Sequence, residues 1–377
     1  MKLKSIILKG FKSIKEMRQP IEFGDISVLL GANGAGKSNL VSFFSMLNYM
    51  TTGSLQTYIG EGGGSQSILH YGPKTTPVIH ADIHFSNQQD MDSYEFSLAH
   101  AAGDSLIFTH ERITWQKIGN NKPYELEFAP GGKESALFKT SKEAKSSTAR
   151  KTAGFIYNLL RNCQVFQFHD TSKNARIRNK VYIEDNRFLY SDAGNLAAFL
   201  YKLKNDEESK KYYDRIVRYI RHIMPQFKDF ELEPSALNRQ YIMLNWREKR
   251  ADYLFGPHQI SDGSLRFVAL ATLLLQPPAS LPSVVIIDEP ELGLHPSAIS
   301  SLAGMAKAAS KHCQVIMATQ SPRLVDEFAA DEIVIVEWND EQNSSEFSRL
   351  DENQLSDWLE RYSLSELWEK NVLRGQP

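Results

Sequence analysis

One stretch, Ile26–Leu40, constrains what this chain can fold into more than any other part. It has the composition of a short buried strand, a glycine-rich turn and the start of a helix, and Gly31, Gly36, Lys37 and Ser38 fit the pattern G-x-x-x-x-G-K-[ST]. Glycines let the backbone wrap closely around phosphate oxygens, and the N–H groups and the helix dipole favour an anion there. An ordinary glycine-rich turn is the weaker interpretation, because the pattern stands between a strand and a helix as the motif requires.

Length and composition describe a globular chain without a signal peptide. The 377 residues can bury a large core and form about two domains or lobes, and 42% hydrophobic with 23% charged residues excludes a disordered chain. Cys163 and Cys313 lack metal-ligand spacing, which indicates free thiols in a reducing compartment. Lysines interrupt the apolar N-terminus, and no apolar run is long enough to span a bilayer. We therefore expect a soluble cytoplasmic protein with no membrane partner.

Charge is distributed unevenly, although the net charge is only −2. Lys139–Lys180 holds ten Lys or Arg against two acids, whereas Asp326–Glu369 holds fourteen acids against two arginines. Such asymmetry suggests that one surface meets a polyanion while another repels it. For either run alone a solvated surface is the simpler interpretation. Lys139–Lys180 is nevertheless our candidate for binding DNA or RNA, and Arg176 and Arg178 are the residues whose charge reversal tests it.

The first half of the chain predicts strands around the phosphate-binding turn and then a separate sheet. Strands are expected near Ser5–Ile14 and Ile21–Leu30, and a helix at Ser38–Met50. Gly60–Ser65 is expected to be a flexible loop. From Thr76 to Phe128 the apolar residues alternate with period two, which predicts an antiparallel meander.

Three polar residues of that meander, His80, Asp82 and His84, fall on one face of a strand. They have the residue types of a metal site, but all come from one strand and no further ligand is evident. The polar face of a half-buried sheet is the favoured interpretation.

The middle of the chain is polar and then helical. Lys139–Lys151 is basic and Ser/Thr-rich, and we expect a mobile connector there. Helices are predicted at Gly194–Lys204 and Glu207–Met224 from their apolar stripes. The second helix carries basic residues beside aromatic ones, which suits a nucleic-acid backbone, although an amphipathic lid helix explains the pattern equally well.

The last third returns to alternating strands and helices. Val284–Glu289 is an apolar run that ends in two acids, and such a strand delivers carboxylates to the sheet edge where open α/β sheets bind ligands. The other expected elements are helices at Phe267–Leu275 and Ala298–Lys311, strands at Gln314–Thr319 and Glu332–Glu337, and acidic helices at Glu352–Arg361 and Ser363–Val372.

Together these motifs resemble the ATPase head of ABC-type proteins, in the branch that contains RecF and SMC proteins. Gly31–Ser38 resembles the Walker A motif and Val284–Glu289 the Walker B motif. Ser261–Arg266 is similar to the ABC signature, with Asp262 where transporters usually have glycine, and Glu291–Pro296 resembles the D-loop.

The resemblance implies roles for single residues. Glu289 is the expected general base, Lys37 bridges the β- and γ-phosphates, and Gln320 holds the place of the switch histidine. Gln167 is the preferred Q-loop glutamine, with Gln164 as the alternative. The implied Mg²⁺ ligands are Ser38, Gln167 and Asp288, and the implied ATP-binding residues are Gly31, Asn33, Gly34, Ala35, Gly36, Lys37, Ser38, Asn39, Ser261, Asp262, Gly263 and Ser264.

The implied fold class is α/β, a P-loop NTPase head of ABC type with a mixed central sheet, an antiparallel β lobe and a helical insertion. We expect an N-terminal ATPase lobe at 1–172, a helical insertion at 173–257 and a C-terminal ATPase lobe at 258–377. In this family the signature covers ATP held by a second subunit, so a head-to-tail homodimer closed by ATP is implied. Because Gln320 cannot shuttle a proton as histidine does, slow hydrolysis is expected.

The closing segment resembles the tail of stand-alone ATPases found in bacterial defence and retron-like systems. A switch that controls a partner effector, such as a nuclease or toxin, is therefore the preferred function, and a RecF-like DNA-repair clamp is the alternative. A transporter subunit, a P-loop kinase and an OLD-type nuclease fit less well. The nuclease is disfavoured because the pair Asp90 and Asp92 is expected in a polar turn and not after an apolar strand.

Overall fold

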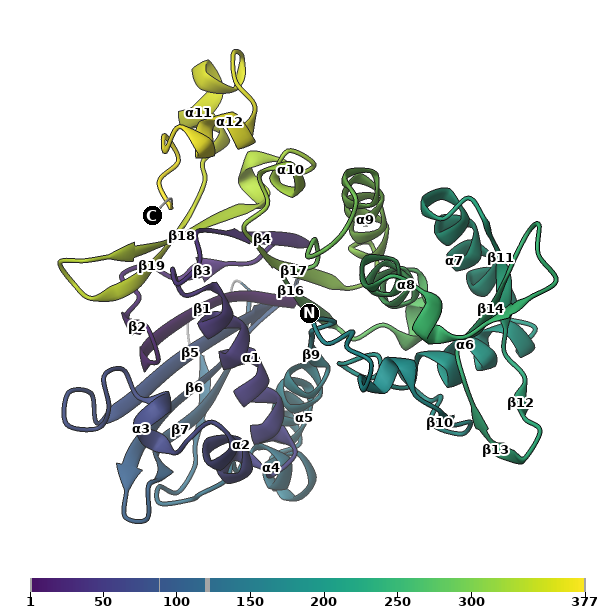
Figure 1. The fold of residues 1–377 in the computed structure, drawn as a ribbon. Helices are drawn as coiled ribbons and strands as arrows, with labels where there is room; N and C mark the ends of the chain where they lie inside the picture. Colours follow the sequence, from purple (N-terminus) through teal and green to yellow (C-terminus); the bar gives the residue numbers. More distant parts are fainter. Residues whose placement is uncertain (1, 88, 119–122, 376–377) are drawn as a thin grey trace. The chain divides into compact units, whose positions relative to one another are not determined.

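The computed structural model describes residues 2–87, 89–118 and 123–375 (Figure 1). Contacts divide the chain into two units. Unit 1 comprises the described residues of Met1–Gln164 and Ala329–Pro377, and unit 2 comprises Val165–Phe328. The division into 1–172, 173–257 and 258–377 stays a prediction.

Unit 1 contains the antiparallel sheet that the alternation in the sequence predicts. Its strands lie in the order β2-β1-β5-β6-β7-β8, with β3 paired to β1 (Figure 1). The strands are β1 (Lys2–Phe11), β2 (Ile14–Glu16), β3 (Ile21–Glu22), β5 (Val78–Ser86), β6 (Asp90–Ala101), β7 (Ser105–Lys117) and β8 (Tyr124–Glu127). The strand expected at Ile21–Leu30 was wrong in one respect, because Phe23–Asp25 interrupts it and separates β3 from β4 (Ile26–Leu30).

Unit 1 also contains helices, and two of them meet the sheet through aromatic contacts. The helices are α1 (Lys37–Thr51), α2 (Leu55–Glu61), α3 (Ser65–Ile68), α4 (Leu137–Glu143) and α5 (Ser147–Arg161). Phe43 of α1 stacks on Phe96 of β6 with ring centroids 6.5 Å apart, and Phe155 of α5 meets Phe85 of β5 edge-on at 6.3 Å. These contacts place the inner face of the sheet in the core of unit 1.

Two loop expectations in this region were wrong. Lys139–Lys151 is not a mobile connector, because it forms the second part of α4 and the start of α5, where Ser146 caps the helix by accepting from the Ala149 N–H. The loop expected at Gly60–Ser65 is shorter than predicted, because Gly60 and Glu61 belong to α2 and Ser65 begins α3, which leaves Gly62–Gly64 between them. Asp90 and Asp92 are also not in a polar turn: both lie in β6, where Asp92 is on the buried face.

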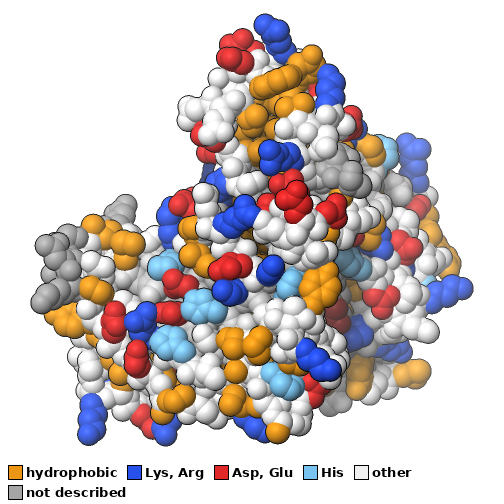
Figure 2. All heavy atoms as spheres, turned by 90° about the vertical axis from the view of Figure 1, so that its left-hand side faces the viewer, with side chains coloured by type: hydrophobic (Ala, Val, Ile, Leu, Met, Phe, Trp, Pro, Cys, Tyr) orange, Lys and Arg blue, Asp and Glu red, His pale blue; other side chains and the backbone are white. Residues whose placement is uncertain are grey.

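The polar stripe on β5 is held by neighbouring side chains. His84 Nε2 lies 2.9 Å from Asp82 Oδ2, and His80 Nδ1 lies 3.1 Å from Ser97 Oγ. Figure 2 shows histidines gathered beside acidic and basic side chains on one face of the molecule. Across the part of the chain that the structure describes, no cluster of His, Cys, Asp and Glu could hold a metal ion.

The rest of unit 1 brings the end of the chain to β4. β18 (Ile333–Asn339) pairs in parallel with the fully buried β4, and β19 (Ser344–Arg349) pairs antiparallel with β18. The strand expected at Glu332–Glu337 is confirmed as β18. α11 (Glu352–Leu359) and α12 (Leu364–Glu369) confirm the two acidic helices.

Unit 2 is built on parallel strands and apolar helices. β16 (Val284–Asp288) and β17 (Gln314–Thr319) pair in parallel with every residue buried. Around them are α8 (Asp262–Leu275), α9 (Pro296–Ala309) and α10 (Pro322–Val325), and β9 (Cys163–Phe166) leads into the unit. Within the described residues, no helix is both long and apolar enough to cross a membrane.

Residues 173–257 contain the expected helices and also strands that the sequence did not predict. The helices are α6 (Leu196–Asn205) and α7 (Lys210–Ile223). The strands are short: β10 (Val181–Tyr182), β11 (Phe227–Glu231), β12 (Pro234–Ser235), β13 (Asn238–Ile242), β14 (Asn245–Glu248) and β15 (Leu254–Phe255). Such short strands give too few alternations to be recognised from periodicity.

Candidate functional site

The glycine-rich turn in unit 1 joins β4 to α1 as its pattern predicts. Lys37 begins α1, is 4% exposed, and donates to the carbonyl oxygens of Gly31 at 2.6 Å and Ala32 at 2.9 Å. The amine therefore lies over the loop that α1 follows. A Cβ added at Gly31 would stand 2.1 Å from the Val336 carbonyl oxygen, so only glycine fits there.

Two further glycines let the turn bend sharply. Gly34 and Gly36 have φ angles of 82° and 112°, a region that disfavours other residues. At Gly36 a Cβ would also collide with Ser345 Oγ at 2.0 Å. Asn33, Gly34 and Ser38 are exposed, whereas Ala35 and Gly36 are buried.

The surroundings of the turn include contacts that the sequence did not indicate. Asn39, an expected ATP-binding residue, donates its amide to Ser13 Oγ at 2.7 Å. The Ala32 N–H donates to the Gly375 carbonyl oxygen at 2.9 Å. The C-terminal segment therefore lies against the first residues of the turn.

Asp288 in unit 2 ends β16 and meets the segment after β9. Gln167 Nε2 donates to Asp288 Oδ2 at 3.2 Å, and His169 Nε2 lies 3.0 Å from the Asp288 carbonyl oxygen. The preferred Q-loop residue and the Walker B aspartate are thus brought together. Gln164, the alternative, lies within β9.

Glu289 follows Asp288 in a conformation that is uncommon for a side chain other than glycine. Its φ is 46°, and its N–H donates to the Ala318 carbonyl oxygen of β17 at 2.8 Å. Left-handed non-glycine residues cost free energy and occur where the surroundings fix them, often at functional sites.

Glu291 connects this turn to the end of β17. Its Oε1 accepts from Thr319 Oγ1 at 2.6 Å and from the Gln320 N–H at 3.2 Å. Burial raises the pKa of the Glu291 carboxyl despite these hydrogen bonds. The sequence placed Glu291 only at the start of the D-loop and gave no sign that it positions the segment carrying Gln320.

The signature turn caps α8. Ser261 Oγ accepts from the Ser264 N–H at 3.2 Å, and the two hydroxyl oxygens are 2.9 Å apart. Ser261 and Asp262 are exposed, and Gly263 and Ser264 are half-buried. A capped, solvent-facing helix N-terminus is suited to an anion.

Asp262, the departure from the usual signature, has a buried partner. Its Oδ1 accepts from Arg178 Nη2 at 2.7 Å, and this pairing lowers the pKa of the Asp262 carboxyl. Arg178 is 4% exposed and also donates to the carbonyl oxygens of Thr171 at 2.8 Å, Ile260 at 3.1 Å and Pro257. The expectation that Arg178 offers its charge to nucleic acid was therefore wrong, because its guanidinium is buried in unit 2 and hydrogen-bonded there to Asp262 and to carbonyl oxygens.

The signature helix and the D-loop approach each other closely. A Cβ at Gly263 would stand 2.1 Å from the Gly293 carbonyl oxygen. Arg266 joins the same region, donating to Leu292 O at 3.1 Å and to His169 O at 2.9 Å. Signature, D-loop and Q-loop segments are thus tied to one another within unit 2.

The fold and these motifs define a class of protein: P-loop NTPases of the ABC and SMC type, which confirms the α/β fold class expected from the sequence. The chain belongs to the family described as "AAA domain, putative AbiEii toxin, Type IV TA system", whose model matches residues 26–326. Its fold is that of the ATPase heads of SMC proteins. None of the curated proteins matches the chain.

Solved structures share the fold at low identity. The structure titled "Crystal structure of the SmcHead bound to the C-winged helix domain of ScpA" has a TM-score of 0.57 and 15% identity, with 95% of this chain and 100% of that one covered. An Smc head from Pyrococcus furiosus with an extended coiled coil, bound to the C-terminal domain of ScpA, has a TM-score of 0.54 and 15% identity over 95% and 98% of the chains.

Proposed function

We propose that this chain binds and hydrolyses ATP. Lys37 and the backbone of the glycine-rich turn bind phosphate oxygens, Glu289 accepts a proton from the attacking water, and Gln320 orients that water. The observation that carries the proposal is the turn itself, where Gly31 and Gly36 leave no space for a Cβ and Lys37 folds over the loop.

The residues also fit Mg²⁺, which prefers a few protein oxygen ligands completed by phosphates and water. Asp288 and Gln167 already lie 3.2 Å apart through their side chains, and Ser38 at the start of α1 supplies a hydroxyl. When bound, Mg²⁺ neutralises charge on the phosphates. Ser38, Gln167 and Asp288 are the ligands we propose.

We further propose that two copies close head-to-tail around ATP. The exposed Ser261 and Asp262, on a capped helix N-terminus, are suited to meet the nucleotide held by a second copy. Because hydrolysis at a site with Gln320 is slow, it sets how long the dimer stays closed. Partner proteins respond to whether the dimer is closed or open.

The process that this switch serves is proposed to be antiviral defence, in which the ATPase controls a nuclease or toxin. The family description, which includes a putative toxin and a toxin–antitoxin system, supports that class of process. A RecF-like clamp for DNA maintenance is the alternative. A reverse transcriptase, nuclease or toxin gene beside this one would favour defence, and repair genes would favour the clamp.

A single pair of variants tests the ATPase. We expect Glu289→Gln to lower phosphate release by about 10²-fold or more, because it removes the general base, while ATP binding persists. With ATP and Mg²⁺ the same variant should elute as a dimer in gel filtration. Glu208→Gln, at an exposed acid, is the matched control and should behave as wild type. Unchanged phosphate release in Glu289→Gln would refute the assignment.

A further inference from the structure

An open groove in unit 2 lies between α7 and α9, outside the motifs discussed above. Its volume is about 880 Å³. One wall is formed by Arg215, Arg218, Tyr219 and His222 of α7. The other wall belongs to the first half of α9, from Ser297 to Gly304.

The α7 wall is a row of two arginines and one histidine without carboxylate partners among the described residues. Arg215, Arg218 and His222 recur at spacings of three and four residues, so they share one face of the helix. Among the described residues, none of the three makes an ion pair or a side-chain hydrogen bond, in contrast to Lys210, which pairs with Asp214 at 3.3 Å. Charged groups left unpaired beside a groove are available to an anionic ligand.

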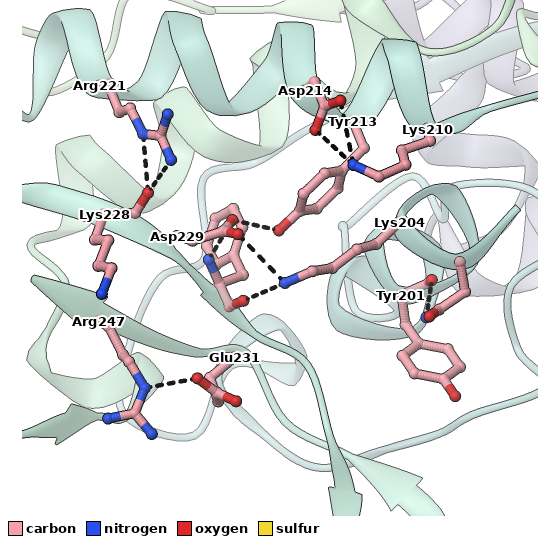
Figure 3. A network of polar contacts seen from close by, with 12 residues as sticks. Tyr201, Lys204, Lys210, Tyr213, Asp214, Arg221, Lys228, Asp229, Glu231 and Arg247 are labelled. Carbon is pink, nitrogen blue, oxygen red and sulfur yellow. Dashed lines mark hydrogen bonds and ion pairs between the residues drawn. The ribbon is translucent and has the colours of Figure 1, made fainter. Parts of the chain in front are cut away.

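The opposite face of α7 is fixed, so the row has a defined position in unit 2. Tyr213 donates to Asp229 Oδ1 at 2.6 Å, and Arg221 Nε donates to the Lys228 carbonyl oxygen at 2.8 Å (Figure 3). Tyr213, Ile216, Val217 and Ile220 are buried. The helix therefore cannot turn its cations inward without losing this network and its apolar contacts.

The α9 wall is hydroxylic and lacks bulky apolar side chains. Ser297, Ser300 and Ser301 line it, and Gly304 leaves open space where a Cβ would stand. Ser300 Oγ donates to Glu327 Oε1 at 2.5 Å, which makes Glu327 the nearby acid that a ligand must avoid.

We propose that this groove binds single-stranded nucleic acid through its sugar–phosphate backbone. Arginine, histidine and serine side chains are suited to phosphate oxygens, and the half-buried Tyr219 offers a ring on which a base can stack. An acidic protein segment fits less well, because protein interfaces depend on aromatic or aliphatic anchors in apolar pockets, and the α9 wall offers serine and glycine. At 1.5 Å per residue, Arg215 to His222 spans about 10 Å, enough for more than one phosphate.

Binding is tested without ATP, so that the result does not depend on hydrolysis or dimerisation. Fluorescence anisotropy with labelled oligo-dT or oligo-U of about twelve nucleotides measures Kd across a salt series. The double variant Arg215→Glu/Arg218→Glu should weaken binding at least tenfold and lower the salt slope by about 1.4, the loss of two phosphate contacts. Comparing the Kd values for oligo-dT and oligo-U shows whether the groove prefers DNA or RNA.

Matched variants make the outcome decisive. Gly304→Glu adds a carboxylate to the opposite wall, at a position where a Cβ meets no atom within 4 Å, and it should also weaken binding. Lys74→Glu/Lys117→Glu makes the same change in charge on exposed residues of unit 1, outside both the groove and Lys139–Lys180, and should leave binding within about twofold of wild type. The proposal is overturned if neither oligonucleotide binds, if the Lys74/Lys117 variant loses as much binding as the Arg215/Arg218 variant, or if poly-glutamate binds in the groove and the oligonucleotides do not. Thermal melting shows that each variant is folded.

Discussion

Arg178 illustrates how one side chain can organise a motif distant from it in sequence. Its guanidinium joins Asp262 and the carbonyl oxygens of Thr171, Pro257 and Ile260, and so fixes the start of α8. Arg178→Ala should lower the free energy of unfolding by about 2 to 3 kcal/mol, because the carbonyl groups of Thr171, Pro257 and Ile260 lose their donor. Chemical denaturation measures this.

Substitutions that keep the charge distinguish geometry from electrostatics at this position. Arg178→Lys should recover little stability, since an ammonium cannot reproduce the planar fork that reaches several acceptors. Arg176→Ala, which removes an exposed pair with Asp192, should cost at most about 1 kcal/mol. Equal losses at Arg176 and Arg178 would contradict this assignment.

Asp92 is a residue whose effect depends on pH. It lies on the buried face of β6 opposite Trp115 of β7, and burial, with Asp90 nearby, raises its pKa to about 6. Because the native state binds its proton more tightly than the unfolded state, this group lowers stability as pH rises from about 4 through 6. Asp92→Asn should therefore stabilise the protein by about 1 to 3 kcal/mol at pH 8 and have little effect at pH 4. A benefit confined to low pH would contradict the argument.

At the scale of elements, two helical glycines provide opposite tests. Gly263→Ala should destabilise by about 1 to 3 kcal/mol, because its Cβ meets the Gly293 carbonyl oxygen and separates α8 from the D-loop. Gly304→Ala in α9 faces open space and should stabilise by about 0.5 to 1 kcal/mol through helix propensity. Thermal melting compares the two variants directly. If both raised the melting temperature, packing around Gly263 would be loose.

The sequence predicted best those elements for which the hydrophobic period and the residues at the ends indicate the same helix or strand. α1, β16 and β17 have an apolar stripe or a continuous apolar run, and each was predicted within a few residues. Alternation predicted the meander that contains β5, β6 and β7, although the start of β6 was expected in a turn. α4 and the start of α5 were missed because Lys139–Lys151 is polar and basic. The first buried residues of α5 are small, and its large buried residues come only later, at Ile156, Tyr157, Leu159 and Leu160.

The sequence predicted those parts of the candidate site that belong to a motif of fixed spacing. It did not predict the parts that depend on contacts between residues distant in the chain. The glycine-rich turn and the acids after β16 have fixed spacing in the sequence. Two hydrogen bonds of the site, Arg178 to Asp262 and Thr319 to Glu291, join residues far apart in the chain. No local sequence pattern predicts such bonds.

At the scale of the whole molecule, the central claim is that two copies complete each other's ATP sites. A single head holds a phosphate-binding turn and an exposed signature, and in the proposed dimer each signature serves the partner's nucleotide. Variants of the two motifs should then complement each other in a mixture, which cannot happen if each copy works alone.

The most direct measurement mixes Lys37→Ala with Ser264→Arg, each inactive by itself, and records ATP hydrolysis. In a head-to-tail pair, one composite site carries both lesions and the other carries none. The head-to-tail dimer predicts that the mixture recovers about a quarter of wild-type activity, since half of the dimers are mixed and half of their sites are intact. A mixture no more active than its two components would contradict the account.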